Sequence, residues 1–210
     1  TAQRTLRYTS RSREAAVAWQ KELRGKFFNL LKLGDLRGAG IPLDAKLVST
    51  ADKGEYTQHE LILRSTPKSM IEVVLTIPKD AKGPLPAVVC INGHGGNRHI
   101  VYNPSSPYKA FADALARKGT ITIATGVGQH EVREPDRMLM GERLWDLIRC
   151  VDYLESRPEV DKKKIGCAGL SLGGEMAMWL AAMDERVAAT VSSGYLTTMD
   201  QMEIGHCMCW

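Results

Sequence analysis

The feature of this chain that most constrains its fold is a repeated alternation of short strand-like runs with segments of helical periodicity. The strand-like runs are residues 86–91, 120–124, 164–169 and 186–191, and the helical segments between them are 110–118, 138–157 and 172–185. A run that is apolar on both faces is typical of a strand inside a parallel sheet. Strands that alternate with helices at this spacing predict βαβ units, so we expect an α/β fold with helices on both faces of a mostly parallel sheet.

The part of the chain before these runs predicts a different arrangement. Residues 56–64 and 69–77 each read as a strand, and Pro67 lies in the short segment between them, so they predict an antiparallel hairpin at the start of the sheet. Residues 1–45 place apolar side chains at helical spacing, with charges between them. We therefore expect a helical N-terminal extension over residues 1–45 that lies across a main domain over residues 46–210.

One motif, Gly169-Leu170-Ser171-Leu172-Gly173, connects a predicted strand to a predicted helix. In this context the pattern is typical of a sharp, strained turn that raises a nucleophilic serine hydroxyl above the sheet. The flanking glycines allow close approach of the backbone, and the N-terminus of the following helix favours a developing negative charge. We therefore expect Ser171 to be a catalytic nucleophile, with the backbone N–H of Leu172 as one donor of an oxyanion hole.

A glycine-rich loop follows the strand at 86–91, and it reads Asn92-Gly93-His94-Gly95-Gly96-Asn97. Its glycines allow the backbone to turn amide groups toward a substrate carbonyl. A second oxyanion donor usually comes from a loop in this position, so we expect the backbone N–H of His94 to supply it. Asn92 stands where such loops usually carry a histidine, and the glycines of the pattern are retained.

Several segments together carry a resemblance to a known superfamily. They are residues 85–89 with 93–96, then 145–154, 157–161, 164–166 and 169–174. Over residues 48–194 the chain resembles the α/β-hydrolase superfamily, and within it the acetyl xylan esterase and dienelactone-hydrolase-like serine esterases. The resemblance implies ester cleavage through an acyl-enzyme on Ser171, acting on small acyl esters such as acetylated carbohydrates, without a metal or an organic cofactor.

A nucleophilic serine needs a histidine base, and the histidine needs a carboxylate that orients it. In this fold the acid and then the histidine follow the serine in sequence, and the resemblance places them after strands later than 186–191. One interpretation is that both partners lie beyond Trp210 and that the C-terminal part of the domain is missing from this chain. The alternative is a compressed triad, in which Asp200 or Glu203 serves as the acid and His206 as the base.

Two rival interpretations of the function remain. The missing base favours a catalytically inactive α/β-hydrolase domain used for binding, whereas the intact Ser171 turn and the intact loop at 92–97 favour an enzyme. A lactone or peptide hydrolase on the same fold also agrees with these residues, because much of the substrate pocket would come from later loops.

Composition excludes several other functional classes. The 28 basic and 24 acidic residues give a net charge of only +4 and form no basic stripe, so no nucleic-acid partner is expected. No apolar stretch approaches the ~18 residues of a membrane span, so no membrane partner is expected. Cys207 and Cys209 beside His206 resemble half of a zinc site, but no second ligand pair is visible and we expect no metal. Cys90 and Cys167 lie in strand-like runs and are expected to be buried, reduced thiols.

The strand at 186–191 would form an exposed apolar edge if the sheet ended there, and such an edge pairs readily with another chain. We therefore expect either a homo-oligomer through this edge or pairing with a missing C-terminal segment. The chain begins at Thr1 without a charged-then-apolar leader. A secreted or periplasmic location after signal removal and a cytoplasmic location both stay open.

Overall fold

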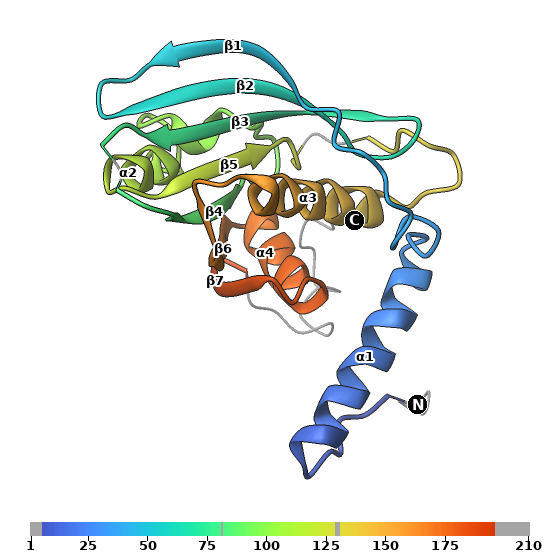
Figure 1. Ribbon diagram of the computed structural model, residues 1–210. Helices are drawn as coiled ribbons and strands as arrows, with labels where there is room; N and C mark the ends of the chain where they lie inside the picture. Colours follow the sequence, from blue (N-terminus) through green and yellow to red (C-terminus); the bar gives the residue numbers. More distant parts are fainter. Residues whose placement is uncertain (1–5, 81, 129–130, 196–210) are drawn as a thin grey trace.

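The computed structural model describes residues 6–80, 82–128 and 131–195, which form a sheet flanked by helices (Figure 1). The strands are β1 (Lys46–Asp52), β2 (Tyr56–Arg64), β3 (Met70–Pro78), β4 (Leu85–Ile91), β5 (Ile121–Thr125), β6 (Val160–Leu170) and β7 (Val187–Ser193). The helices are α1 (Arg13–Leu30), the 3-10 helix η1 (Ile100–Tyr102), α2 (Phe111–Arg117), α3 (Leu139–Ser156) and α4 (Leu172–Met183). The predicted strands and helices after residue 55 are all present, with ends that differ by a few residues.

The seven strands form one sheet in the order β1-β2-β3-β5-β4-β6-β7. Neighbours from β1 to β5 pair antiparallel, and neighbours from β5 through β4 and β6 to β7 pair parallel. The hairpin at the start and the parallel strands that follow confirm the predicted α/β-hydrolase fold class. The antiparallel part is one strand larger than the predicted hairpin, because β1 precedes it.

Strand β1 is the one strand of the described residues that the sequence pattern does not predict. It pairs with β2 over its length, with an irregularity between Leu47 and Ser49. All seven of its residues are exposed, so neither face of the strand is buried. Without a buried face there is no alternation of apolar and polar residues to mark a strand, and pairing at the sheet edge alone places this segment.

Helices cover both faces of the sheet, and β4 shows how its side chains divide between them. Cys90 lies in a small apolar cluster with Tyr108 and with Ala112 of α2. Val89 and Ile91 belong instead to the main core, which α3 and α4 complete on the other face. Since successive strand residues point to opposite faces, the continuous apolar run of β4 fills two cores at once.

The cysteines of the strands are buried thiols, as predicted. Cys90 of β4 and Cys167 of β6 are both free and buried, and Cys150 of α3 is a third such residue. Burial raises the pKa of Cys167 to about 11. A thiol with so high a pKa stays protonated near neutral pH and is a poor nucleophile.

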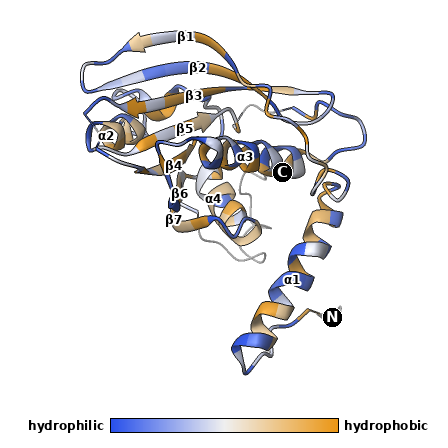
Figure 2. Ribbon diagram, in the orientation of Figure 1, coloured by the Kyte–Doolittle hydropathy of each residue, from blue (hydrophilic) through white to orange (hydrophobic). Residues whose placement is uncertain are grey.

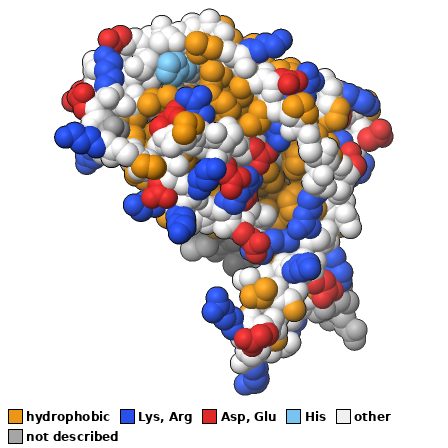
Figure 3. Space-filling view, in the orientation of Figure 1, with side chains coloured by type: hydrophobic (Ala, Val, Ile, Leu, Met, Phe, Trp, Pro, Cys, Tyr) orange, Lys and Arg blue, Asp and Glu red, His pale blue; other side chains and the backbone are white. Residues whose placement is uncertain are grey.

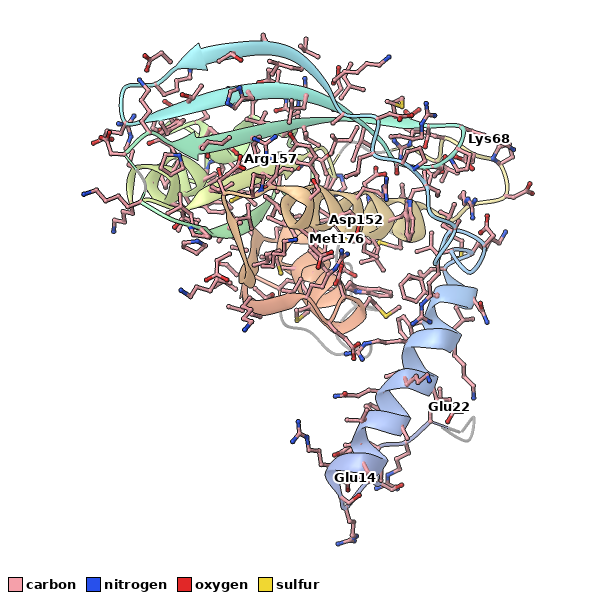
Figure 4. The ribbon with its side chains drawn as sticks, in the orientation of Figure 1. Glu14, Glu22, Lys68, Asp152, Arg157 and Met176 are labelled. Carbon is pink, nitrogen blue, oxygen red and sulfur yellow. The ribbon has the colours of Figure 1, made fainter. Side chains whose placement is uncertain are left out.

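Helix α1 projects from the body of the molecule, which corrects the expectation that it lies across the main domain (Figure 1). Its C-terminal half packs against α4, where the rings of Phe27 and Trp179 have centroids 5.2 Å apart. Its N-terminal half mixes polar and apolar residues around its surface (Figure 2) and forms an arm in the space-filling view (Figure 3). Val17 on this arm is 54% exposed. Glu14 and Glu22 lie on this arm, away from the sheet (Figure 4). Neither α1 nor another helix of the described residues is long and apolar enough to span a membrane.

The segment between β5 and α3 is held against the turn that joins β2 to β3, which Lys68 marks in Figure 4. The guanidinium of Arg133 lies 2.7 Å from the carboxylate of Asp146 in α3, which is only 1% exposed. The hydroxyl of Thr66 in the turn donates a hydrogen bond to Glu134. The buried carboxylate of Asp146 would be left without this charged partner if Arg133 moved away, so these contacts hold residues 133–134 against the turn between β2 and β3.

Candidate active site

The candidate site lies at the carboxyl ends of β4 and β6, where the strand order reverses. From β4 the chain passes to β5 on one side, and it then returns to β6 on the other side of β4. In open α/β sheets such a reversal leaves a crevice beyond the carboxyl ends of the strands, where ligands bind. The loop after β4 and the turn after β6 meet at this point, and these two segments contain the predicted nucleophile and oxyanion donors.

Ser171 occupies the turn between β6 and α4 in a conformation that few side chains adopt. Its φ is 59° and its ψ is −126°, and the residue is exposed. Its N–H donates to the carbonyl oxygen of Ser193 over 2.9 Å, and its own carbonyl oxygen accepts from the N–H of Glu175 over 3.1 Å. A positive φ at a non-glycine residue stores strain and persists only when the surroundings require it, which is typical of a nucleophile turn.

The two glycines of the motif are required because the backbone passes so close to them. A Cβ atom at Gly169 would lie 2.0 Å from the carbonyl oxygen of Gly173. A Cβ atom at Gly173 would lie 2.3 Å from the carbonyl oxygen of Ile91, at the end of β4. A larger residue at either position would therefore displace the turn or the strand, which confirms the predicted close approach of the backbone.

The loop after β4 forms a tight turn, residues 93–96, directly beside Ser171. The N–H of Gly96 donates to the carbonyl oxygen of Gly93 over 3.2 Å, and Gly95 has a φ of 73°. A positive φ at the third position is the pattern of a type II turn. A Cβ atom at Gly93 would lie only 3.3 Å from Cβ of Ser171, and His94 occupies the exposed second position of the turn. The fold thus brings together the two segments that were predicted to carry the oxyanion donors.

Leu172, the other predicted donor, begins α4 immediately after Ser171. Its side chain is buried, with 2% of its surface exposed. Its N–H is one of the first in the helix, which have no partner within the helix and lie at the positive end of the helix dipole. The backbone of Leu172 is therefore placed where an anion next to Ser171 would be stabilised.

Asn92 holds the loop after β4 to the loop after β5. Its fully buried side chain accepts a hydrogen bond from the N–H of Val127 over 3.1 Å and donates one to the carbonyl oxygen of Gly93 over 3.1 Å. Gly128 packs against the same carbonyl so closely that a Cβ atom there would lie 2.0 Å from it. The residue that replaces the usual histidine thus clamps two loops, a role that depends on β4 and β5 being neighbours.

We expect Asn92→Ala to lower the free energy of unfolding of the full-length protein by about 1–3 kcal/mol, because the buried N–H of Val127 would lose its Asn92 acceptor and the carbonyl oxygen of Gly93 would keep only the N–H of Gly96 as a donor. Urea unfolding followed by tryptophan fluorescence measures this change. Asn103→Ala is the control, since Asn103 is exposed and its side chain accepts a hydrogen bond from the N–H of Ser105. Equal losses of unfolding free energy in the two variants would contradict the role of Asn92 in holding the two loops together.

A buried polar group lies behind the Ser171 turn. Glu175 in the first turn of α4 is 3% exposed, and Arg143 of α3 is 4% exposed. Burial raises the pKa of Glu175, while a hydrogen bond with Tyr195 and the charge of Arg143 lower it in part. The hydroxyl of Ser192 donates to the carbonyl oxygen of Tyr195 over 3.1 Å. No sequence pattern marks this group, because its members come from three elements that only folding brings together.

Tyr108 is a further residue at the site that the sequence analysis did not single out. It lies between η1 and α2, and its hydroxyl oxygen accepts a hydrogen bond from the N–H of Gly93, which is 15 positions earlier in the chain. No local pattern marks such a residue, since a buried tyrosine in an apolar context is most often part of the core.

The predicted acid and base lie outside the described residues. This applies to Asp200, Glu203 and His206, and also to Cys207 and Cys209, whose spacing resembles half of a zinc site. The choice between a compressed triad and partners later in the protein therefore stays open. What the described residues provide is the strained turn at Ser171 and, beside it, the two segments that were predicted to carry oxyanion donors.

Comparison with known proteins gives the family of the chain and the proteins that share its fold. The family model described as "Dienelactone hydrolase family" matches residues 71–203. YtaP of Bacillus subtilis (strain 168), a protein named as a hydrolase, is 28% identical over 190 residues, which are 81% of this chain and 62% of YtaP. The chain thus spans about three fifths of the length of that curated relative.

Solved structures share the fold at low sequence identity. A Bacteroides fragilis NCTC 9343 protein named as an acetyl xylan esterase superposes with a TM-score of 0.71 at 18% identity, over 87% of this chain and 55% of that one. An acetyl xylan esterase from Paenibacillus sp. R4 superposes with a TM-score of 0.59 at 23% identity, over 77% of this chain and 56% of that one. At these identities the likeness shows the fold alone. The family match covers most of the chain, and the chain therefore belongs to the dienelactone hydrolase family, within the α/β-hydrolase superfamily.

Proposed function

We propose that this protein is a serine hydrolase that cleaves carboxylic esters through an acyl-enzyme on Ser171. The observation that carries the proposal is the strained, exposed Ser171 turn packed against the glycine-rich turn at 93–96. Strain of this kind costs free energy and is kept at functional sites. Membership of the dienelactone hydrolase family supports hydrolysis as the reaction class.

In the proposed reaction the Ser171 hydroxyl oxygen attacks the acyl carbon of the ester while a histidine takes the hydroxyl proton. The ester carbonyl oxygen becomes an oxyanion and accepts hydrogen bonds from the N–H groups of Leu172 and His94. When this intermediate collapses, the alcohol leaves with the proton from the histidine, and the acyl group stays on Ser171. Water then attacks the acyl-enzyme with the same histidine as base, which releases the carboxylic acid and restores the serine.

Apart from Ser171, the N–H groups of Leu172 and His94 are the catalytic groups that we assign to the described part of the site. Donors that already point at the developing charge need no reorganisation during the reaction, and removal of one such donor typically costs about 10²–10³-fold in kcat. Leu172 is held by its place in α4, and the turn at 93–96 is held by the Asn92 clamp. Both donors are backbone groups, so substitution of the His94 side chain should lower kcat less than a displacement of its backbone N–H.

As substrate we propose a small acyl ester, such as an acetyl group on a carbohydrate. The support is the fold shared with two proteins named as acetyl xylan esterases. Release of acetate from acetylated xylo-oligosaccharides, compared with hydrolysis of p-nitrophenyl acetate and p-nitrophenyl octanoate, measures this preference. Faster hydrolysis of the octanoyl ester would contradict the small-acyl proposal without touching the role of Ser171.

The nucleophile itself is tested with a fluorophosphonate probe, followed by mass spectrometry of peptides. The 210-residue chain and the product of its complete reading frame, called the full-length protein, are labelled in parallel, with heat-denatured samples as controls. We expect an adduct on Ser171 in the native full-length protein and none after denaturation, because only an activated serine reacts with the probe. A native full-length protein that takes up no probe would contradict the enzyme proposal and favour a binding domain. An adduct on the 210-residue chain would favour Asp200 or Glu203 with His206 as acid and base.

A further inference from the structure

The environment of Tyr108 sets it apart from the other tyrosines of the chain. Its ring belongs to the apolar cluster of Cys90, Val101 and Ala112, on the face of the sheet that α2 covers, and the residue is only 9% exposed. Its hydroxyl reaches out of this cluster and accepts the hydrogen bond from the N–H of Gly93. A buried tyrosine hydroxyl needs a polar partner, and here the partner is the first amide of the turn at 93–96.

The hydroxyl meets the nucleophile turn at the same place. The position that a Cβ atom of Gly93 would occupy lies 2.7 Å from the Tyr108 hydroxyl oxygen, 2.6 Å from the carbonyl oxygen of Leu170 and 3.3 Å from Cβ of Ser171. The three groups therefore surround one backbone position, and only a glycine fits between them. Any movement of the Gly93 peptide would change the distance between the turn at 93–96 and Ser171.

We propose that Tyr108 is a positioning residue of the oxyanion hole, an inference that rests on the proposed esterase function. Its hydroxyl engages the N–H of Gly93, so this amide is directed toward Tyr108 and not toward the substrate. The orientation of the 92–93 peptide is thereby fixed, and the next amide, that of His94, is presented beside Ser171. Tyr108 acts through the backbone of Gly93 and does not itself touch the reacting atoms.

The turn at 93–96 needs such a contact because its backbone has unusually large conformational freedom. The turn contains Gly93, Gly95 and Gly96, and glycine loses more conformational freedom on folding than any other residue. Catalysis by an oxyanion hole depends on donors that are oriented before the reaction starts. A rigid aromatic side chain packed in a core supplies a fixed acceptor for this purpose, and the Asn92 side chain holds the Gly93 carbonyl from the other side.

The test compares Tyr108→Phe with Tyr102→Phe in the full-length protein. Tyr102 is the matched control, because its ring packs on the same cluster while its hydroxyl bonds to that of Thr122 over 2.9 Å. For Tyr108→Phe we expect kcat for p-nitrophenyl acetate to fall about tenfold with KM within about twofold, a smaller loss than direct removal of an oxyanion donor causes. We also expect faster hydrogen exchange at the Gly93 amide, measured by mass spectrometry with fragmentation, because this amide loses its acceptor. Tyr102→Phe should change neither quantity.

Each result decides the inference. A lower kcat together with faster Gly93 exchange supports it, and a change in only one of the two overturns it, as does an equal change in Tyr102→Phe. A wild-type protein that hydrolyses no ester and takes up no fluorophosphonate overturns the oxyanion role together with the proposed function. The exchange measurement separates these failures, because it reports the contact between Tyr108 and Gly93 whether or not the protein is an enzyme.

Discussion

Ser171→Ala is expected to reduce kcat for ester hydrolysis by the full-length protein about 10⁶-fold, since loss of a catalytic serine removes the covalent route and the nucleophile and its base act as one unit. The remaining rate would come from the oxyanion donors and from binding alone. Alanine keeps the Cβ atom and removes only the hydroxyl, so the strain at φ 59° is unchanged. Initial rates with p-nitrophenyl acetate measure the loss, and urea unfolding checks that the fold is retained.

The control for this variant is Ser105→Ala, which removes a hydroxyl from an exposed serine in the segment between η1 and α2. Its hydrolysis rate should equal that of the wild type. If Ser171→Ala retained a tenth or more of the wild-type rate, the reaction would use another nucleophile and the acyl-enzyme proposal would be wrong.

Gly128→Ala is expected to lower kcat/KM about 10²-fold, even though residue 128 is predicted to take no part in the chemistry, because a misplacement of about 1 Å in a catalytic group can cost that much. A Cβ atom at this position would lie 2.0 Å from the carbonyl oxygen of Gly93, and real contacts of this kind essentially never fall below 3.0 Å. Both partners belong to backbone, so the turn at 93–96 must move away from the loop after β5. Its amides would then no longer be aligned with Ser171.

Gly126→Ala provides a matched control two positions earlier in the same loop. A Cβ atom at Gly126 would meet no atom within 4 Å, and neither glycine has a positive φ. We expect the activity of this variant to be unchanged and its stability to be equal or slightly higher, since alanine reduces the entropy of the unfolded chain. Equal losses of kcat/KM in the two variants, or full activity in Gly128→Ala, would show that the contact with Gly93 does not align the site.

These variants test one structural idea, that the site is aligned by backbone contacts between loops. Gly93 touches the Ser171 turn, the loop after β5 and Tyr108, while the N–H of Ser171 bonds to the end of β7. A strained residue persists when its surroundings leave it no alternative, and close contacts from several elements provide that restraint. Among glycine-to-alanine substitutions, we therefore expect the largest losses of activity where the added Cβ atom would push apart two backbone segments of the site.

The sequence by itself determined the parallel part of the sheet and the sharp turn on which the candidate site is built. The buried strands β4 and β5 could be predicted because an apolar run is a property of neighbouring residues. The same holds for the turn around Ser171, where two glycines at fixed spacing follow a strand and precede a helix. The order of the two oxyanion segments along the chain, with Gly93 upstream of Ser171, completed the prediction without any knowledge of contacts.

Only the tertiary structure decided how these parts are held together. The partner of Tyr108 lies 15 positions away and that of Asn92 lies 35 positions away. The first contact exists because Tyr108 packs on the face of the sheet that α2 covers, and the second because β4 and β5 are neighbours. Strand β1 also escaped prediction, and so did the projection of the predicted helix α1 away from the sheet, because exposed apolar residues in both elements do not show where the element packs. Periodicity reports which face of an element is buried, whereas pairing at an edge and hydrogen bonds between distant loops depend on which elements become neighbours.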